Sequence, residues 1–115
     1  MKKTIRVSAV IGSKICIAVE DGQKLFDILH QAISDNDQLE VSFEGIELII
    51  SAFLNTAIGQ LYGVFSEETV TTMISYTHLE EDDEELLRLV IANALRYYSN
   101  REGYDNAVRE DLDYE

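Results

Sequence analysis

The chain has 115 residues, of which 46% are hydrophobic and 27% are charged, and its formal net charge is -13. This length and composition fit one globular domain and exclude a disordered or fibrous chain. The acidic excess argues against contact with a phosphate backbone, so we expect no nucleic-acid partner. The single cysteine, Cys16, excludes an intrachain disulfide and indicates a reducing compartment, which predicts a cytoplasmic protein.

The first twenty residues predict a β-hairpin. Apolar and polar residues alternate over residues 5–9, Gly12 marks a turn, and residues 14–19 form a short apolar, β-branched run. Two lysines near the start are typical of a signal peptide, but Arg6 interrupts any apolar region behind them. We therefore expect a hairpin and no export signal.

A helix and a further strand are predicted next. Residues 21–34 place apolar side chains at helical spacing, with Asp21 as the expected N-cap. Polar residues 35–37 close this helix, and residues 39–43 alternate as a half-buried strand does. A turn at Gly45 should end the strand.

Residues 48–65 carry no charge, which raises the question of a membrane span. The run is shorter than the roughly 20 apolar residues that a span needs, and it contains several polar side chains. Leu54, Ile58 and Leu61 lie at helical spacing. The stretch therefore predicts a buried strand end followed by a helix over residues 51–65, and we expect no membrane association.

The last third predicts a short helical turn, a strand at residues 73–76 and a long helix beginning after Leu79. The acidic run 80–85 suits the start of that helix, where the dipole favours negative charge. The pattern decays after Asn100. We expect one domain over residues 1–100 and an acidic, mobile C-terminal tail over residues 101–115.

Together these elements predict an α/β fold, with a mixed, largely parallel four-stranded sheet and about three to four helices packed on it. No P-loop, GxGxxG or GxSxG motif occurs, so we expect no enzyme and no catalytic residue. His30 and His78 are isolated in sequence, and the acidic run lacks calcium-loop spacing. We expect no metal and no cofactor, and we interpret Cys16 as a small buried hydrophobe.

Ser51 stands at the predicted start of a helix and has two readings. It can cap the helix by accepting a backbone N–H of the first turn. The same position suits a phosphorylated serine, because added charge on a rigid helix start changes a docking surface without unfolding the domain. The free N–H groups there could also hold the phosphate of a small ligand or nucleotide.

Two segments resemble a known family. FEGIELIISAFLNTAIGQLYGVF (43–65) and EELLRLVIANALRYY (84–98) are similar to the STAS-like family of bacterial proteins of unknown function. They are more distantly similar to the STAS domains of anti-sigma-factor antagonists. The most specific parts are the E-G-I-E turn and the S-x-F-L-N helix start.

In those antagonists a serine at this helix is phosphorylated by a partner ATPase-type serine kinase, and the resemblance aligns Ser51 with it. The resemblance implies a non-enzymatic regulatory module that binds a protein partner, with a serine-kinase-like ATPase as the candidate partner. The candidate phosphorylation or partner-binding residues are Ser51, Phe53, Asn55, Gly45 and Glu47. Two alternatives stay open: small-ligand or nucleotide binding near Ser51, and an acidic inhibitor that covers a basic nucleic-acid-binding surface.

Overall fold

The computed structural model describes residues 2–114, with side chains described through Ser99. Residues 2–114 contain five strands: β1 Lys2–Arg6, β2 Ile15–Cys16, β3 Gln38–Ser42, β4 Leu48–Ile49 and β5 Ile74–Thr77. Five α-helices and one 3-10 helix accompany them: α1 Val7–Ile11, α2 Val19–Ser34, α3 Ser51–Ala57, η1 Gly59–Gly63, α4 Glu67–Met73 and α5 Glu81–Tyr114.

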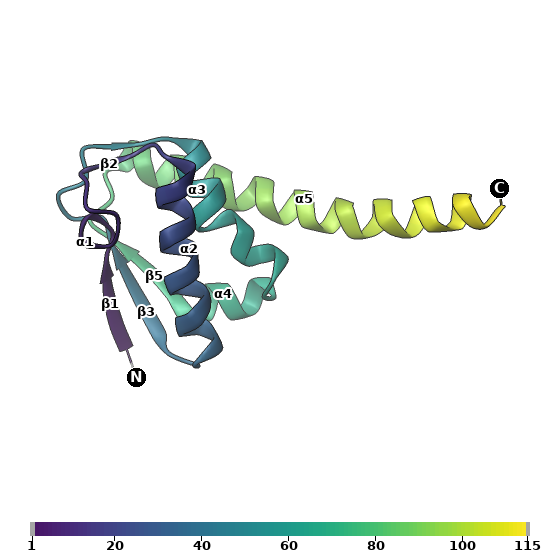
Figure 1. The fold of residues 1–115 in the computed structure, drawn as a ribbon, viewed down its shortest axis with the longest axis horizontal. Coiled ribbons are helices and arrows are strands. Elements are labelled where there is room, and N and C mark those ends of the chain that lie inside the picture. Colours follow the sequence, from purple (N-terminus) through teal and green to yellow (C-terminus); the bar gives the residue numbers. More distant parts are fainter. Residues whose placement is uncertain (1, 115) are drawn as a thin grey trace.

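The strands form two separate parallel sheets. Three of them pair in the order β1-β3-β5, and β2 pairs with β4. Figure 1 shows α2 running alongside the three strands, with β2 beyond their carboxyl ends. The α/β class predicted from sequence is confirmed, whereas the single mixed, four-stranded sheet is not: every pairing between the described strands is parallel, and β2–β4 stands apart.

The core lies on one face of the three-stranded sheet. Leu39, Val41 and Phe43 alternate along β3 and its end, and all three are buried. α2, the segment from α3 to η1, and α5 contribute most of the other large buried side chains. These include Leu25, Leu29, Phe53, Leu54, Ile58, Leu61, Leu87 and Val90. The predicted burial of the uncharged stretch is therefore confirmed for its helical part.

The predicted N-terminal hairpin is wrong. Val7 and Ile11 are buried and lie four residues apart, which places them on one face of the short helix α1. Gly12 ends that helix with φ 68°, and its N–H donates to the Ser8 carbonyl at 2.9 Å. A helix between β1 and β2 sends the two strands into different sheets, because helical spacing at this point outweighs the local alternation.

The second helix starts earlier than predicted. α2 begins at Val19 after Ala18, so Asp21 does not cap it but lies in the first turn. There its charge suits the positive end of the helix dipole, and its carboxylate lies 3.7 Å from Lys24 Nζ. The predicted end at Ser34 is confirmed.

The helix predicted over residues 51–65 is divided into α3 and η1 at Ile58. The η1 segment packs closely on α5, since a Cβ added at Gly63 would lie 2.4 Å from the Tyr98 ring. Gly59 lies against Val90 and Ala94 of the same helix. The predicted apolar stripe is correct, and the helix type changes where the glycines let the chain approach α5.

The longest helix, α5, continues through Tyr114, beyond the end predicted near Asn100 (Figure 1). The side chains of residues 100–115 lie outside the described residues, so the mobility predicted for the tail stays a prediction. Within residues 2–114, no helix combines the length and apolar character needed to cross a bilayer.

Candidate functional site

The carboxyl ends of β3 and β5 open onto a cavity of about 590 Å³, which we call the edge cavity. Its walls are the loop between β3 and β4 and the loop between β5 and α5. Ligand sites in open parallel sheets commonly lie outside the carboxyl ends of the strands. The lining residues are Lys14, Phe43, Glu44, Gly45, Ile46, Glu47, Ile49, His78, Leu79, Glu80 and Asp83.

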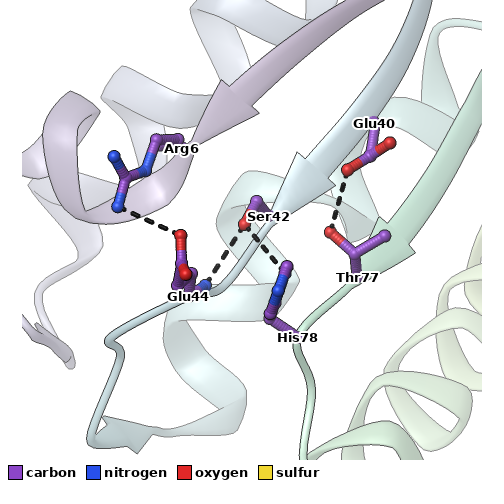
Figure 2. Close-up of polar contacts among 6 residues, drawn as sticks. All are labelled: Arg6, Glu40, Ser42, Glu44, Thr77 and His78. Carbon is purple, nitrogen blue, oxygen red and sulfur yellow. Dashed lines mark hydrogen bonds and ion pairs between the residues drawn. The ribbon is translucent and has the colours of Figure 1, made fainter.

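A buried serine joins the two loops that form these walls. Ser42 is 4% exposed, and its Oγ lies 3.3 Å from His78 Nδ1 and accepts the Glu44 N–H at 3.3 Å (Figure 2). Ser42 and His78 come from the ends of neighbouring strands that are 36 residues apart in sequence. The contact holds Nδ1 of His78. The second polar atom of the ring is Nε2, and the ring lines the cavity.

His78 also has a left-handed backbone, with φ 60°. A residue with a Cβ adopts this conformation at a cost of about 1–2 kcal/mol, so the surrounding contacts must hold it there. Gly45, on the opposite wall, has φ 80° at no such cost. Both loops therefore turn sharply at the cavity.

Polar side chains continue along the outer face of the three-stranded sheet. Arg6 Nη2 lies 3.2 Å from Glu44 Oε1, and the Thr77 hydroxyl donates to Glu40 Oε2 at 3.3 Å (Figure 2). Lys2 Nζ lies 3.7 Å from Glu40 Oε1. The Arg6–Glu44 pair is exposed on both sides, so it adds little to stability and mainly orients the loop after β3.

The edge cavity is acidic. Glu44, Glu47, Glu80 and Asp83 line it, against the single amine of Lys14. Partial burial, followed by the charges of Glu80 and Asp82, raises the pKa of the Asp83 carboxyl. A cationic group in the cavity would relieve this repulsion. Among the side chains of residues 2–99, no group of three or more His, Cys, Asp or Glu is arranged to hold a metal ion.

The five residues predicted for the site are spread over three environments. Gly45 and Glu47 line the edge cavity. Ser51 is exposed at the start of α3, and Asn55, farther along that helix, lines a separate groove against α5. Phe53 is fully buried, so it belongs to the core and has no surface to offer a partner, which corrects its assignment as a partner-binding residue.

The predicted capping role of Ser51 is also wrong. Ile50 is the N-cap of α3, no side chain caps this end, and Ser51 is the first helical residue. Its exposed hydroxyl is free of that role. Because α3 has only seven residues, its dipole is a weak basis for the predicted phosphate or nucleotide site.

An exposed apolar surface next to Ser51 was missed from sequence. Ile15 and Leu48 are register partners in β2–β4, and they are 41% and 50% exposed. Ile17 and Ile50 follow at the same two-residue spacing and are 49% and 37% exposed. We call these four residues the apolar face. Cys16 and Ile49 point to the buried side, so both sides of this sheet are apolar and sequence alternation gave no signal for exposure.

Comparison with protein families decides what kind of domain carries these features. The model of the family described as a STAS-like domain of unknown function (DUF4325) matches residues 21–84. The chain belongs to this family. The matched part of the STAS-like domain runs from α2 to the first turn of α5 and includes both walls of the edge cavity. Searches of curated proteins and of solved structures find no significant match.

Proposed function

We propose that this STAS-like domain is a non-enzymatic regulatory module of the bacterial cytoplasm that binds a protein partner through the apolar face. The observation that carries the proposal is the exposure of four large aliphatic side chains on one side of β2–β4. A contiguous apolar patch of this kind is typical of protein interaction sites. The distant likeness to anti-sigma-factor antagonists supports a regulatory role.

Phosphorylation of Ser51 is the proposed switch. Ser51 is exposed and directly follows Ile50, a member of the apolar face. A phosphate would add a charge of about -1.5 to -2 beside aliphatic side chains, where it would oppose the docking of an apolar surface. The kinase in this scheme is a serine-kinase-like ATPase, as in the antagonists that the chain resembles.

The test compares partner recovery by wild type, Leu48→Lys and Val64→Lys after cross-linking in the native host. Val64 is exposed to a similar extent, 54%, but does not belong to the apolar face. We expect the partner bound by wild type and by Val64→Lys to be lost with Leu48→Lys, since a buried lysine at an interface centre costs at least tenfold in affinity. Equal recovery by all three would exclude the apolar face.

The switch has its own measurement. Ser51→Glu should weaken recovery of the same partner, while Ser51→Ala should bind as wild type does. Mass spectrometry of the chain isolated from cells should find phosphate on Ser51. Unmodified Ser51 under all growth conditions, together with equal binding of both variants, would remove the switch and leave the apolar face in place.

A further inference from the structure

The three-stranded sheet ends in two edge strands, and β1 is the open one. Figure 1 shows β1 at the outer border of this sheet, where β3 is its one neighbour among the described strands. Four of the five β1 residues are exposed, and Ile5 is half-buried. The free side of β5 differs, because the Ile74 N–H donates to the Val70 carbonyl and ties that edge to α4. An open edge such as β1 is a template for pairing with another strand.

The strand register shows which backbone groups of β1 are free. The Phe43 N–H donates to the Thr77 carbonyl of β5 at 3.0 Å, so residues 39, 41 and 43 direct their backbone groups to β5. Residues 38, 40 and 42 therefore direct theirs to β1. Thr4 is the register partner of Glu40. In a parallel pair Glu40 bonds to the residues on either side of Thr4, which leaves the Thr4 N–H and C=O on the open side.

A groove of about 320 Å³ follows this edge between β1 and α2. Its apolar lining comes from Ile5, Ile28 and Ala32, and Ile28 is 38% exposed. The other lining residues are Lys3, Asp27, Gln31 and Asp35. Side chains of a strand added beside β1 would alternate between this groove and the outer face of the sheet. The groove therefore favours an apolar side chain at every second position of the added strand.

The outer face of the same edge is basic. Lys2 and Arg6 share that face with Thr4, since residues two apart in a strand point the same way. The Lys2 and Arg6 side chains are 58% and 59% exposed, although each lies near a glutamate on the β3 side. Opposite charges on neighbouring strands stabilise their pairing, and like charges oppose it. Acidic side chains therefore suit the outer face of the added strand.

The same charges separate a partner protein from a second copy of the chain. Two β1 strands paired antiparallel about Thr4 would place Lys2 of each copy opposite Arg6 of the other. Like charges directly opposite each other destabilise a strand pair. Self-pairing through this edge is therefore disfavoured.

We infer that β1 accepts an extended segment of a partner protein as a fourth strand, with apolar residues in the groove and acidic residues beside Lys2 and Arg6. In strand addition, main-chain hydrogen bonds supply affinity, and pockets for alternate side chains supply specificity. The inference is independent of the proposed function, because β1 and the apolar face belong to different sheets.

Synthetic peptides test this chemistry directly. The probes are capped hexapeptides of alternating valine and glutamate, valine and lysine, and serine and glutamate, each with a terminal tryptophan. The chain has no tryptophan, so the probe emission reports binding to the full chain. Titrations are made at physiological ionic strength, where screening limits long-range repulsion to about 8 Å. We expect the valine–glutamate peptide to bind most tightly, and the same peptide with every backbone N–H methylated to lose binding.

Variants of β1 then assign the contact. Thr4→Pro removes an N–H on the open side and spares the bonds to β3, so it should weaken the valine–glutamate peptide about tenfold. Thr4→Val keeps the N–H and should bind as wild type does. The double variant Lys2→Glu, Arg6→Glu should prefer the valine–lysine peptide, because the charge pairs are reversed. Leu48→Lys, on the apolar face, should leave peptide binding unchanged. Circular dichroism confirms that each variant is folded.

The contrary results are equally specific. Equal binding of the methylated peptide, or wild-type affinity of folded Thr4→Pro, would exclude pairing at the β1 edge. An unfolded Thr4→Pro leaves the methylated peptide as the decisive comparison. Loss of peptide binding in Leu48→Lys would move the peptide to the apolar face, and binding of no peptide would reject the fourth strand. Either result leaves the partner-recovery test of the proposed function intact. Dimerisation in sedimentation equilibrium, lost in Thr4→Pro, would make a second copy the occupant instead.

Discussion

Cys16 is fully buried on the inner side of β2–β4, as its apolar sequence context predicts. Burial raises the pKa of the Cys16 thiol to about 12, and the charges of Asp21 and Asp83 act in the same direction. Only the thiolate is an effective nucleophile, so both access and ionisation suppress its reactivity. The residue packs as a small hydrophobe.

Thiol labelling checks this prediction. At neutral pH the native chain should react with a disulfide reagent at least about a thousandfold more slowly than the urea-unfolded chain. The raised pKa alone lowers the fraction of Cys16 present as thiolate by about a thousandfold. The unfolded chain is the control for reagent quality. Rapid labelling of the folded chain, without loss of its circular dichroism signal, would contradict the burial.

At the scale of elements, α2 and α3 approach each other closely at Gly22. A Cβ added there would lie 2.9 Å from the Phe53 carbonyl oxygen and 3.0 Å from Thr56 Cβ. Backbone cannot move aside as a flexible side chain can. Gly22 is thus a packing requirement, although alanine is normally the better helix former.

Gly22→Ala should therefore destabilise the domain by about 1–3 kcal/mol, the usual range for overpacking, in spite of the helix propensity that alanine gains. The matched control is Lys24→Ala, two residues along the same helix, where the side chain is exposed and forms a weak ion pair with Asp21. Urea unfolding measures both. A more stable Gly22→Ala would show that the two helices can separate at little cost.

On the scale of the whole molecule, burial makes one thiol and two phenol groups hold their protons more tightly when folded. Burial raises the pKa values of Cys16, Tyr62 and Tyr76. Their contribution to stability is complete below the unfolded pKa values and is lost as pH rises toward the folded values, because the unfolded chain then releases protons that the folded chain retains. Tyr76 also carries a buried hydroxyl that finds no hydrogen-bond partner among residues 2–99.

The free energy of unfolding should therefore fall steadily above about pH 9–10. Tyr76→Phe should reduce this slope, and at neutral pH it should raise stability by about 1 kcal/mol, since it removes an unpaired buried polar group. Tyr97→Phe, at a tyrosine that is 59% exposed, should change neither quantity. Urea titrations at pH 8, 9.5 and 10.5 measure both effects, and identical slopes in the two variants would contradict them.

Local patterns in the sequence were sufficient for several conclusions. The spacing of Leu25 and Leu29 gave α2, and the alternation of residues 39–43 gave β3. The segment 43–65 pointed to the STAS-like family, which the match over residues 21–84 confirms. Helical period, strand period and motif identity are properties of neighbouring residues, so a linear reading can detect them.

Tertiary structure alone decided which strands pair and which apolar residues stay exposed. The sequence predicts residues 14–19 as a strand of a hairpin and residues 48–50 as a buried strand end, yet the apolar face is exposed because β2 and β4 pair away from the main sheet. Ser42 and His78 meet only through the parallel pairing of β3 and β5. Ser51 does not cap α3, because Ile50 takes the N-cap position and Ser51 is the first helical residue. Contacts of this kind depend on free energies summed over distant segments, and no window of sequence contains them.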